Sequence, residues 1–135
     1  EAGGLPENLG RVTRVLSFLA DADERRVAEA VRPHLDAVLE LLAADNEGVN
    51  GAAVGLLMYV GEQYPQEVAE GTEELLALLD ARDDSVRGSA AWVLGAVGGE
   101  TARERLSTVA EEDPSEEVRQ AAAHAADRIA DRTAA

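Results

Sequence analysis

The chain has 135 residues, of which 27 are acidic and 12 are basic, and its formal net charge at pH 7 is −15. That length suits one domain spanning residues 1–135, large enough to bury roughly two thirds of its unfolded surface. The sequence has no Cys, which excludes disulfides and thiolate chemistry. Its acidic balance argues against binding nucleic acid or anionic lipid, because both need clustered basic residues.

In chain order, the first element we expect is a helix near residues 8–20. It includes the segment VTRVLSFLADADE, which begins at Val12. Residues 23–32 are interpreted either as a separate short helix or as a kinked lead-in to the next helix. Pro33 then stands at the expected first turn of that helix, where its missing N–H costs no hydrogen bond.

Three later segments repeat the pattern that begins at Val12. They start at Val49, Val86 and Val118 and read VNGAAVGLLMYVG, VRGSAAWVLGAVG and VRQAAAHAADRIA, with successive offsets of 37, 37 and 32 residues. Positions 0, 3, 4, 7, 8 and 11 of each copy are mostly small or apolar, which is the period of a helix that buries one stripe. We therefore expect equivalent helices near residues 46–61, 84–98 and 115–132.

A second apolar pattern lies between these copies and repeats with them. Its positions are Val38, Leu39, Leu41 and Leu42, then Leu75, Leu76, Leu78 and Leu79, and finally Leu106 and Val109. The repeating unit is therefore a first helix, a short acidic turn and a second helix. Because one such pair cannot bury its apolar stripe alone, we expect an all-α fold, an α-α superhelix of about four stacked helix pairs with the first incomplete.

The turns and the second helices also carry a family resemblance. The strings from Asp84 to Gly95 and from Asp113 to Ala122 place an acidic turn before a Val-Arg pair and an Ala-rich helix. They resemble HEAT repeats of the phycobilisome-lyase type, and the resemblance extends over about residues 8–132. It implies an armadillo-like curved stack, or solenoid, whose second helices line the concave side. Most members of that family are protein-interaction scaffolds, and some attach bilin chromophores to phycobiliproteins.

The resemblance also implies ion pairs between the acidic turn and the arginine that follows it. The expected pairs are Asp83 or Asp84 with Arg87, and Asp113 with Arg119. Asn50 and Thr13 stand where the other copies have Arg, so the ladder of pairs is not expected to continue into the first two copies.

One position of the second helices points away from the apolar stripe. It holds Phe18, Gly55, Trp92 and His124 in the four copies, and these residues should form a row across the stack with Met58 and Tyr59 beside it. Large apolar groups on an open face indicate a contact surface, since Trp and Tyr are favoured binding anchors. The candidate partner-binding residues are Phe18, Met58, Tyr59, Trp92 and His124. The alternative for Trp92 is a structural filler whose ring covers the neighbouring Ala-rich helix.

Several glycines interrupt the second helices. Gly51, Gly55, Gly88 and Gly95 each cost about 1 kcal/mol relative to Ala in a helix interior. Two accounts are open: the helices approach closely at these positions, or a groove is kept open beside Trp92.

The sequence shows no arrangement that carries catalysis. It has no GxSxG, HExxH, P-loop or calcium-loop motif. Of the two His, His34 is interpreted as a solvated surface group and His124 as part of the row above. We therefore expect no catalytic residue, no cofactor and no metal site, and we interpret the acidic clusters as solvated surface.

These observations favour a cytoplasmic, non-enzymatic scaffold that binds a partner protein or peptide on its concave face, with a basic partner favoured. The alternative is a bilin-lyase-like or chaperone activity, which the family resemblance implies. The longest near-apolar run, Gly51 to Gly61, is about half of the ~20 residues that a membrane-spanning helix needs, so no membrane partner is expected.

All 12 basic residues are Arg, and this acidic, Lys-free composition resembles that of salt-in halophiles such as haloarchaea; an ordinary acidic protein is the alternative.

Overall fold

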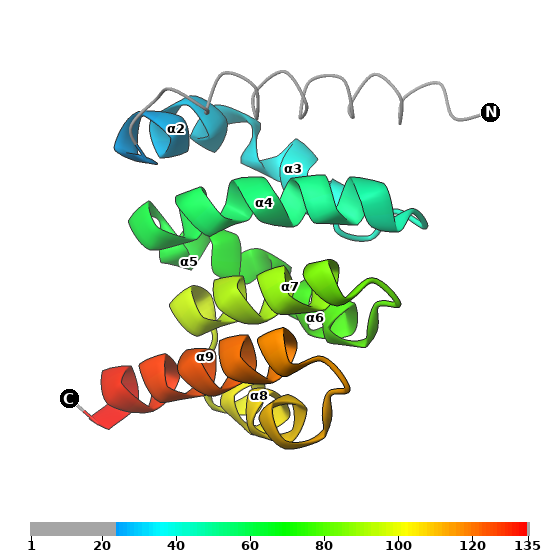
Figure 1. Ribbon diagram of the computed structural model, residues 1–135. Helices are drawn as coiled ribbons and strands as arrows, with labels where there is room; N and C mark the ends of the chain where they lie inside the picture. The colour runs from blue at the N-terminus through cyan, green and yellow to red at the C-terminus, as the bar shows by residue number, and fades with distance from the viewer. Residues whose placement is uncertain (1–23, 135) are drawn as a thin grey trace.

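The computed structural model describes residues 24–134, and all regular secondary structure in that range is helical (Figure 1). No strand occurs among these residues and the helices pack as successive pairs, so the expected all-α superhelix is confirmed. The helix expected near residues 8–20, which includes Phe18, lies outside the described residues.

Three helix pairs follow one another within residues 24–134. The first consists of α2 (Glu24–Val31), η1 (Arg32–His34) and α3 (Leu35–Leu41), followed by α4 (Glu47–Gln63). The second consists of α5 (Pro65–Val68), η2 (Ala69–Gly71), α6 (Thr72–Ala77) and η3 (Leu78–Asp80), followed by α7 (Asp84–Val97). The third consists of α8 (Glu100–Glu112) and α9 (Glu116–Ala134).

The first helix of two pairs is broken at the same place. The short 3-10 turns η1 and η2 begin at Arg32 and Ala69, which are 37 residues apart. Pro33 lies in η1 rather than in the first turn of α3, and η2 has no proline. The break therefore does not depend on proline, and of the two interpretations of residues 23–32 the structure supports the separate short helix, α2, which η1 joins to α3.

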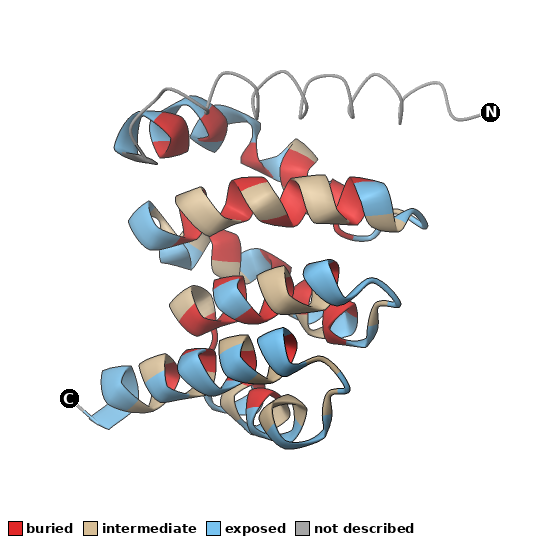
Figure 2. Cartoon of the chain, viewed as in Figure 1, coloured by how far each residue is buried: buried red, intermediate tan, exposed pale blue. Residues whose placement is uncertain are grey.

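The second helices α4, α7 and α9 lie side by side in one layer, with α5, α6 and α8 behind them (Figure 1). Val49, Val86 and Val118 are all buried, as their shared place in the repeat predicts. Leucines of the first helices, such as Leu75 and Leu106, fill the space between the two layers and are fully buried. Buried residues are concentrated where helices face one another (Figure 2).

Each second helix begins with an equivalent cap. The side chains of Asn46, Asp83 and Ser115 accept hydrogen bonds from backbone N–H groups in the first turns of α4, α7 and α9, at 3.1, 2.8 and 3.3 Å. These three residues are separated by the same 37 and 32 residues as the apolar pattern. The cap thus belongs to the repeat, and it satisfies donors that a helix start leaves free.

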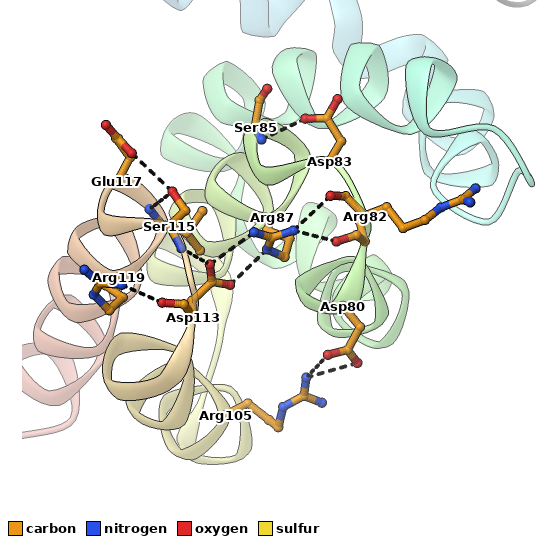
Figure 3. A network of polar contacts seen from close by, with 12 residues as sticks. Asp80, Arg82, Asp83, Ser85, Arg87, Arg105, Asp113, Ser115, Glu117 and Arg119 are labelled. Carbon is orange, nitrogen blue, oxygen red and sulfur yellow. Dashed lines mark hydrogen bonds and ion pairs between the residues drawn. The ribbon is translucent and has the colours of Figure 1, made fainter.

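The turns between first and second helices form a polar network that joins successive pairs (Figure 3). Arg87 donates from Nε and Nη2 to the two carboxylate oxygens of Asp113, at 2.9 and 3.1 Å, and from Nη1 to the carbonyl of Ala81 at 2.9 Å. This differs from the expected pairing of Arg87 with Asp83 or Asp84. The Asp83 carboxylate is bound to the N–H of Ser85, and the long Arg87 side chain reaches the turn of the next pair.

The expected pair of Asp113 with Arg119 also takes a different form. Arg119 donates from Nη1 to the backbone carbonyl of Asp113 at 2.7 Å, so the carboxylate is left for Arg87 and for the N–H of Ser115. Burial alone would raise the pKa of Asp113, but the hydrogen bonds from Arg87 and Ser115 and the nearby guanidinium charges lower it below its ordinary value.

Candidate functional site

A groove crosses the layer of second helices at the predicted row. It is formed by α4, α7 and α9 and has a volume of about 690 Å³. Its lining residues are Gly55, Met58, Tyr59, Glu62, Trp92, His124 and Arg128. We call it the second-helix groove. The structure therefore brings Met58, Tyr59, Trp92 and His124 together from three successive helices, whereas Phe18 lies outside the described residues.

Trp92 and His124 occupy equivalent positions of adjacent helices, and their rings stack. The ring centroids are 5.3 Å apart and the planes are inclined by 22°. Trp92 is nevertheless 36% exposed, and among the described residues no other large hydrophobic side chain is exposed. Trp92 therefore packs against the neighbouring helix and also presents apolar surface to the groove.

Two glycines near the groove have different surroundings. A Cβ atom at Gly55 would meet no atom within 4 Å, so this glycine borders open space in the groove that Trp92 also lines. A Cβ atom at Gly95 would lie 2.9 Å from both Cα and Cβ of Ala125, so that glycine permits the close contact of α7 with α9. Each of the two accounts of the helical glycines thus holds at a different position.

An ion pair spans the groove from α9 to α4. Arg128 donates from Nη1 and Nη2 to the two carboxylate oxygens of Glu62, at 2.9 and 3.1 Å. In α7, which lies between these helices, the position equivalent to Arg128 holds the short side chain of Ala96.

Glu62 and Arg128 were not among the residues that the sequence pattern singled out. Their spacing carries a signal, because Glu62 follows Tyr59 by three residues and Arg128 follows His124 by four, which places both on the predicted row. Their pairing joins residues 66 apart in the chain, and it depends on how far apart α4 and α9 lie across α7.

The groove offers aromatic rings, a thioether and one closed ion pair. Such a lining can enclose an apolar or aromatic side chain and stack against it. Within residues 24–134, no group of three or more His, Asp or Glu side chains is placed to hold a metal ion.

These features define a class of protein: an α-α superhelix with a groove across its second helices. The family model described as HEAT repeats matches residues 72–135, the part of the chain that contains α6 to α9, and this match supports a HEAT-repeat protein. No curated protein and no solved structure matches the chain. None of the described helices is long and apolar enough to cross a membrane.

Proposed function

We propose that this protein is a non-enzymatic interaction scaffold that binds a segment of a partner protein in the second-helix groove. The observation that carries the proposal is the convergence of Met58, Tyr59, Trp92 and His124, from three helices, on one groove whose largest apolar side chain is exposed. HEAT repeats commonly mediate protein–protein interaction, which supports the same function. Trp, Tyr, Met and Arg are also the residue types enriched at protein interfaces.

A peptide library displayed on phage tests the proposal directly. The library is panned on the wild-type protein, and each selected sequence is then measured against Trp92→Ala by calorimetry. We expect the selected peptides to lose at least about tenfold in affinity for Trp92→Ala, because a buried aromatic anchor is worth about 2 kcal/mol or more.

The matched control is Leu39→Ala. Leu39 is a half-buried apolar residue that lines a separate hollow between the first helices, together with Asp36, Glu40 and Glu70. Peptides that bind wild type, Trp92→Ala and Leu39→Ala equally well would refute the proposal. Circular dichroism of both variants establishes that the helices are retained.

A finer assignment, to HEAT repeats of the phycobilisome-lyase type, is supported by the string from Asp84 to Gly95 and by its equivalent after Asp113. Mixing the protein with a free bilin tests the lyase-like alternative, for which a red-shifted absorbance band is expected.

A cytoplasmic location and a salt-rich cellular environment are further parts of the proposal, supported by the acidic, Lys-free composition.

A further inference from the structure

The helix α9, which contributes His124 and Arg128 to the second-helix groove, also carries two acidic side chains on that face. Asp127 and Asp131 follow His124 by three and seven residues and are exposed on the same face of α9. Neither carboxylate forms an ion pair with a described residue. The arginine between them, Arg128, has both terminal nitrogens on Glu62, so its charge is already neutralised.

These two carboxylates work against the stability of the helix that carries them. Asp131 lies in the last turn of α9, where the helix dipole presents its negative end. Asp127 and Asp131 are four residues apart, a spacing at which like charges repel on a helix surface. The repulsion between Asp127 and Asp131 would be relieved by a cationic ligand bound at the groove.

The charge of the whole chain narrows the choice of occupant. A second copy would bring another net charge of −15 to the same face, and nucleic acid or anionic lipid would also be repelled. A basic segment, by contrast, is attracted by the negative electrostatic potential of this protein. Trp92, which is partly exposed, also offers an aromatic face to a cationic side chain.

We infer that the partner segment in the second-helix groove is basic: an apolar side chain enters beside Trp92, and flanking arginine or lysine side chains contact Asp127 and Asp131. This inference rests on the proposed function and specifies the chemistry of the partner. It also identifies Asp127 and Asp131 as residues that set specificity without lining the groove itself.

Three synthetic amphipathic peptides test the inference. They share the same leucine and phenylalanine positions, contain no tryptophan, and carry arginine, glutamine or glutamate at the remaining positions. Binding is measured by calorimetry, and by the fluorescence of Trp92, which is the only Trp in the chain and reports on the groove. We expect the arginine peptide to bind at least about tenfold more tightly than the glutamate peptide at low salt, and the difference to shrink near 1 M salt.

Two double variants distinguish recognition by Asp127 and Asp131 from a general effect of the protein's net charge on peptide binding. Asp127→Asn with Asp131→Asn removes the charges at the groove, and Glu70→Gln with Glu74→Gln removes equal charge at the hollow between the first helices. Binding of the arginine peptide should weaken at least about threefold in the first variant and stay within about twofold of wild type in the second.

Each other outcome overturns the inference in a distinguishable way. Equal binding of all three peptides, with binding lost in Trp92→Ala, leaves the proposed scaffold function standing and refutes a basic partner. Equal weakening in both double variants shows only general attraction to an acidic protein and refutes the roles of Asp127 and Asp131. Binding of no peptide, or binding that is unaffected in Trp92→Ala, contradicts the proposed function and the inference together.

Discussion

At the scale of single residues, the position that follows the first valine has one structural task in the three copies that the structure describes. Asn50 donates from Nδ2 to the carbonyl of Ala44, Arg87 donates to that of Ala81, and Arg119 to that of Asp113. These carbonyls lie at equivalent places where a first helix has ended, and such groups lack partners within the helix. Asn and Arg thus perform the same task at different positions, and Arg87 additionally reaches the next pair.

The first prediction concerns Arg87. Replacing it with Ala removes a bidentate partner from the Asp113 carboxylate, whose side chain is only 6% exposed, and should lower the free energy of unfolding by about 2–4 kcal/mol. Arg103→Ala is the control, because Arg103 forms an exposed pair with Glu100 and the loss of such a pair should change the free energy of unfolding very little. Urea titrations followed by circular dichroism measure both, and equal losses would show that the Arg87 pair is not special.

The second prediction concerns the pH dependence of the same pair. Because the pKa of Asp113 is lowered in the native state, its ionised form stabilises the fold fully above its unfolded pKa of about 3.9. That contribution is lost as the pH falls from there through the lower native pKa. The difference in unfolding free energy between wild type and Asp113→Asn should therefore be constant from pH 7 to about pH 5 and should narrow below about pH 4.

Urea titrations at several pH values measure this difference. The other acidic groups, including the Asp83 cap, are present in both proteins and largely cancel. A difference that stays constant down to pH 3 would show that Asp113 does not titrate as its contacts with Arg87 and Ser115 require.

At the scale of helices, the contact between α7 and α9 is close, and the groove beside it is open. The Arg132 side chain of α9 also donates from Nη1 and Nη2 to the carbonyls of Gly95 and Gly98, at 2.9 and 2.8 Å, and so caps the end of α7. The two helices are therefore joined by backbone proximity and by a charged cap. On the other side of α7, Gly55 leaves open space.

The third prediction uses these glycines as a matched pair. Gly95→Ala would place Cβ within 2.9 Å of Ala125 and should destabilise the protein by about 1–3 kcal/mol through overpacking. Gly55→Ala meets no atom and should stabilise it by up to about 1 kcal/mol through higher helix propensity. Thermal unfolding measures both, and a Gly95→Ala protein as stable as wild type would show that α7 and α9 can move apart at little cost.

At the scale of the whole molecule, the net charge of −15 opposes the compact state, because repulsion between acidic residues is greater when the chain is folded. Ion pairs such as Arg32 with Glu67 and Arg105 with Asp80 link neighbouring pairs, but the acidic residues outnumber the arginines. Dissolved salt screens the remaining repulsion: at 1 M the Debye length is about 3 Å, so charges farther apart than this interact weakly.

The fourth prediction follows from this repulsion. Raising KCl from about 0.05 M to 1 M should increase the melting temperature by about 5 °C or more, which corresponds to roughly 1 kcal/mol for a domain of this size. Differential scanning calorimetry measures the change, with sucrose at matched osmolality as the uncharged control. A melting temperature that does not change with KCl would show that repulsion is a minor term and would count against the salt-rich environment proposed above.

Periodicity in the sequence was sufficient to predict α4, α7 and α9, the pairing of helices into a repeated unit, and the row that holds Trp92 and His124. This works because each pair packs mainly on its neighbours, so one stripe of apolar residues, repeated every 37 or 32 residues, contains the information for the stack. The placement of Met58, Tyr59, Trp92 and His124 in one groove follows from the same register.

Only the tertiary structure decided which charged residues meet. Arg87 pairs with the next turn rather than its own, and Arg128 pairs with Glu62 of α4 across α7, because a long arginine side chain can reach a partner beyond its own turn when the packing brings that partner close. The sequence determined the repeating unit and the direction in which each side chain points. The distances between units depend on how residues such as Gly95 and Ala96 set the separation of the packed helices. No single copy of the repeat contains that information, because the separation depends on residues of two neighbouring units.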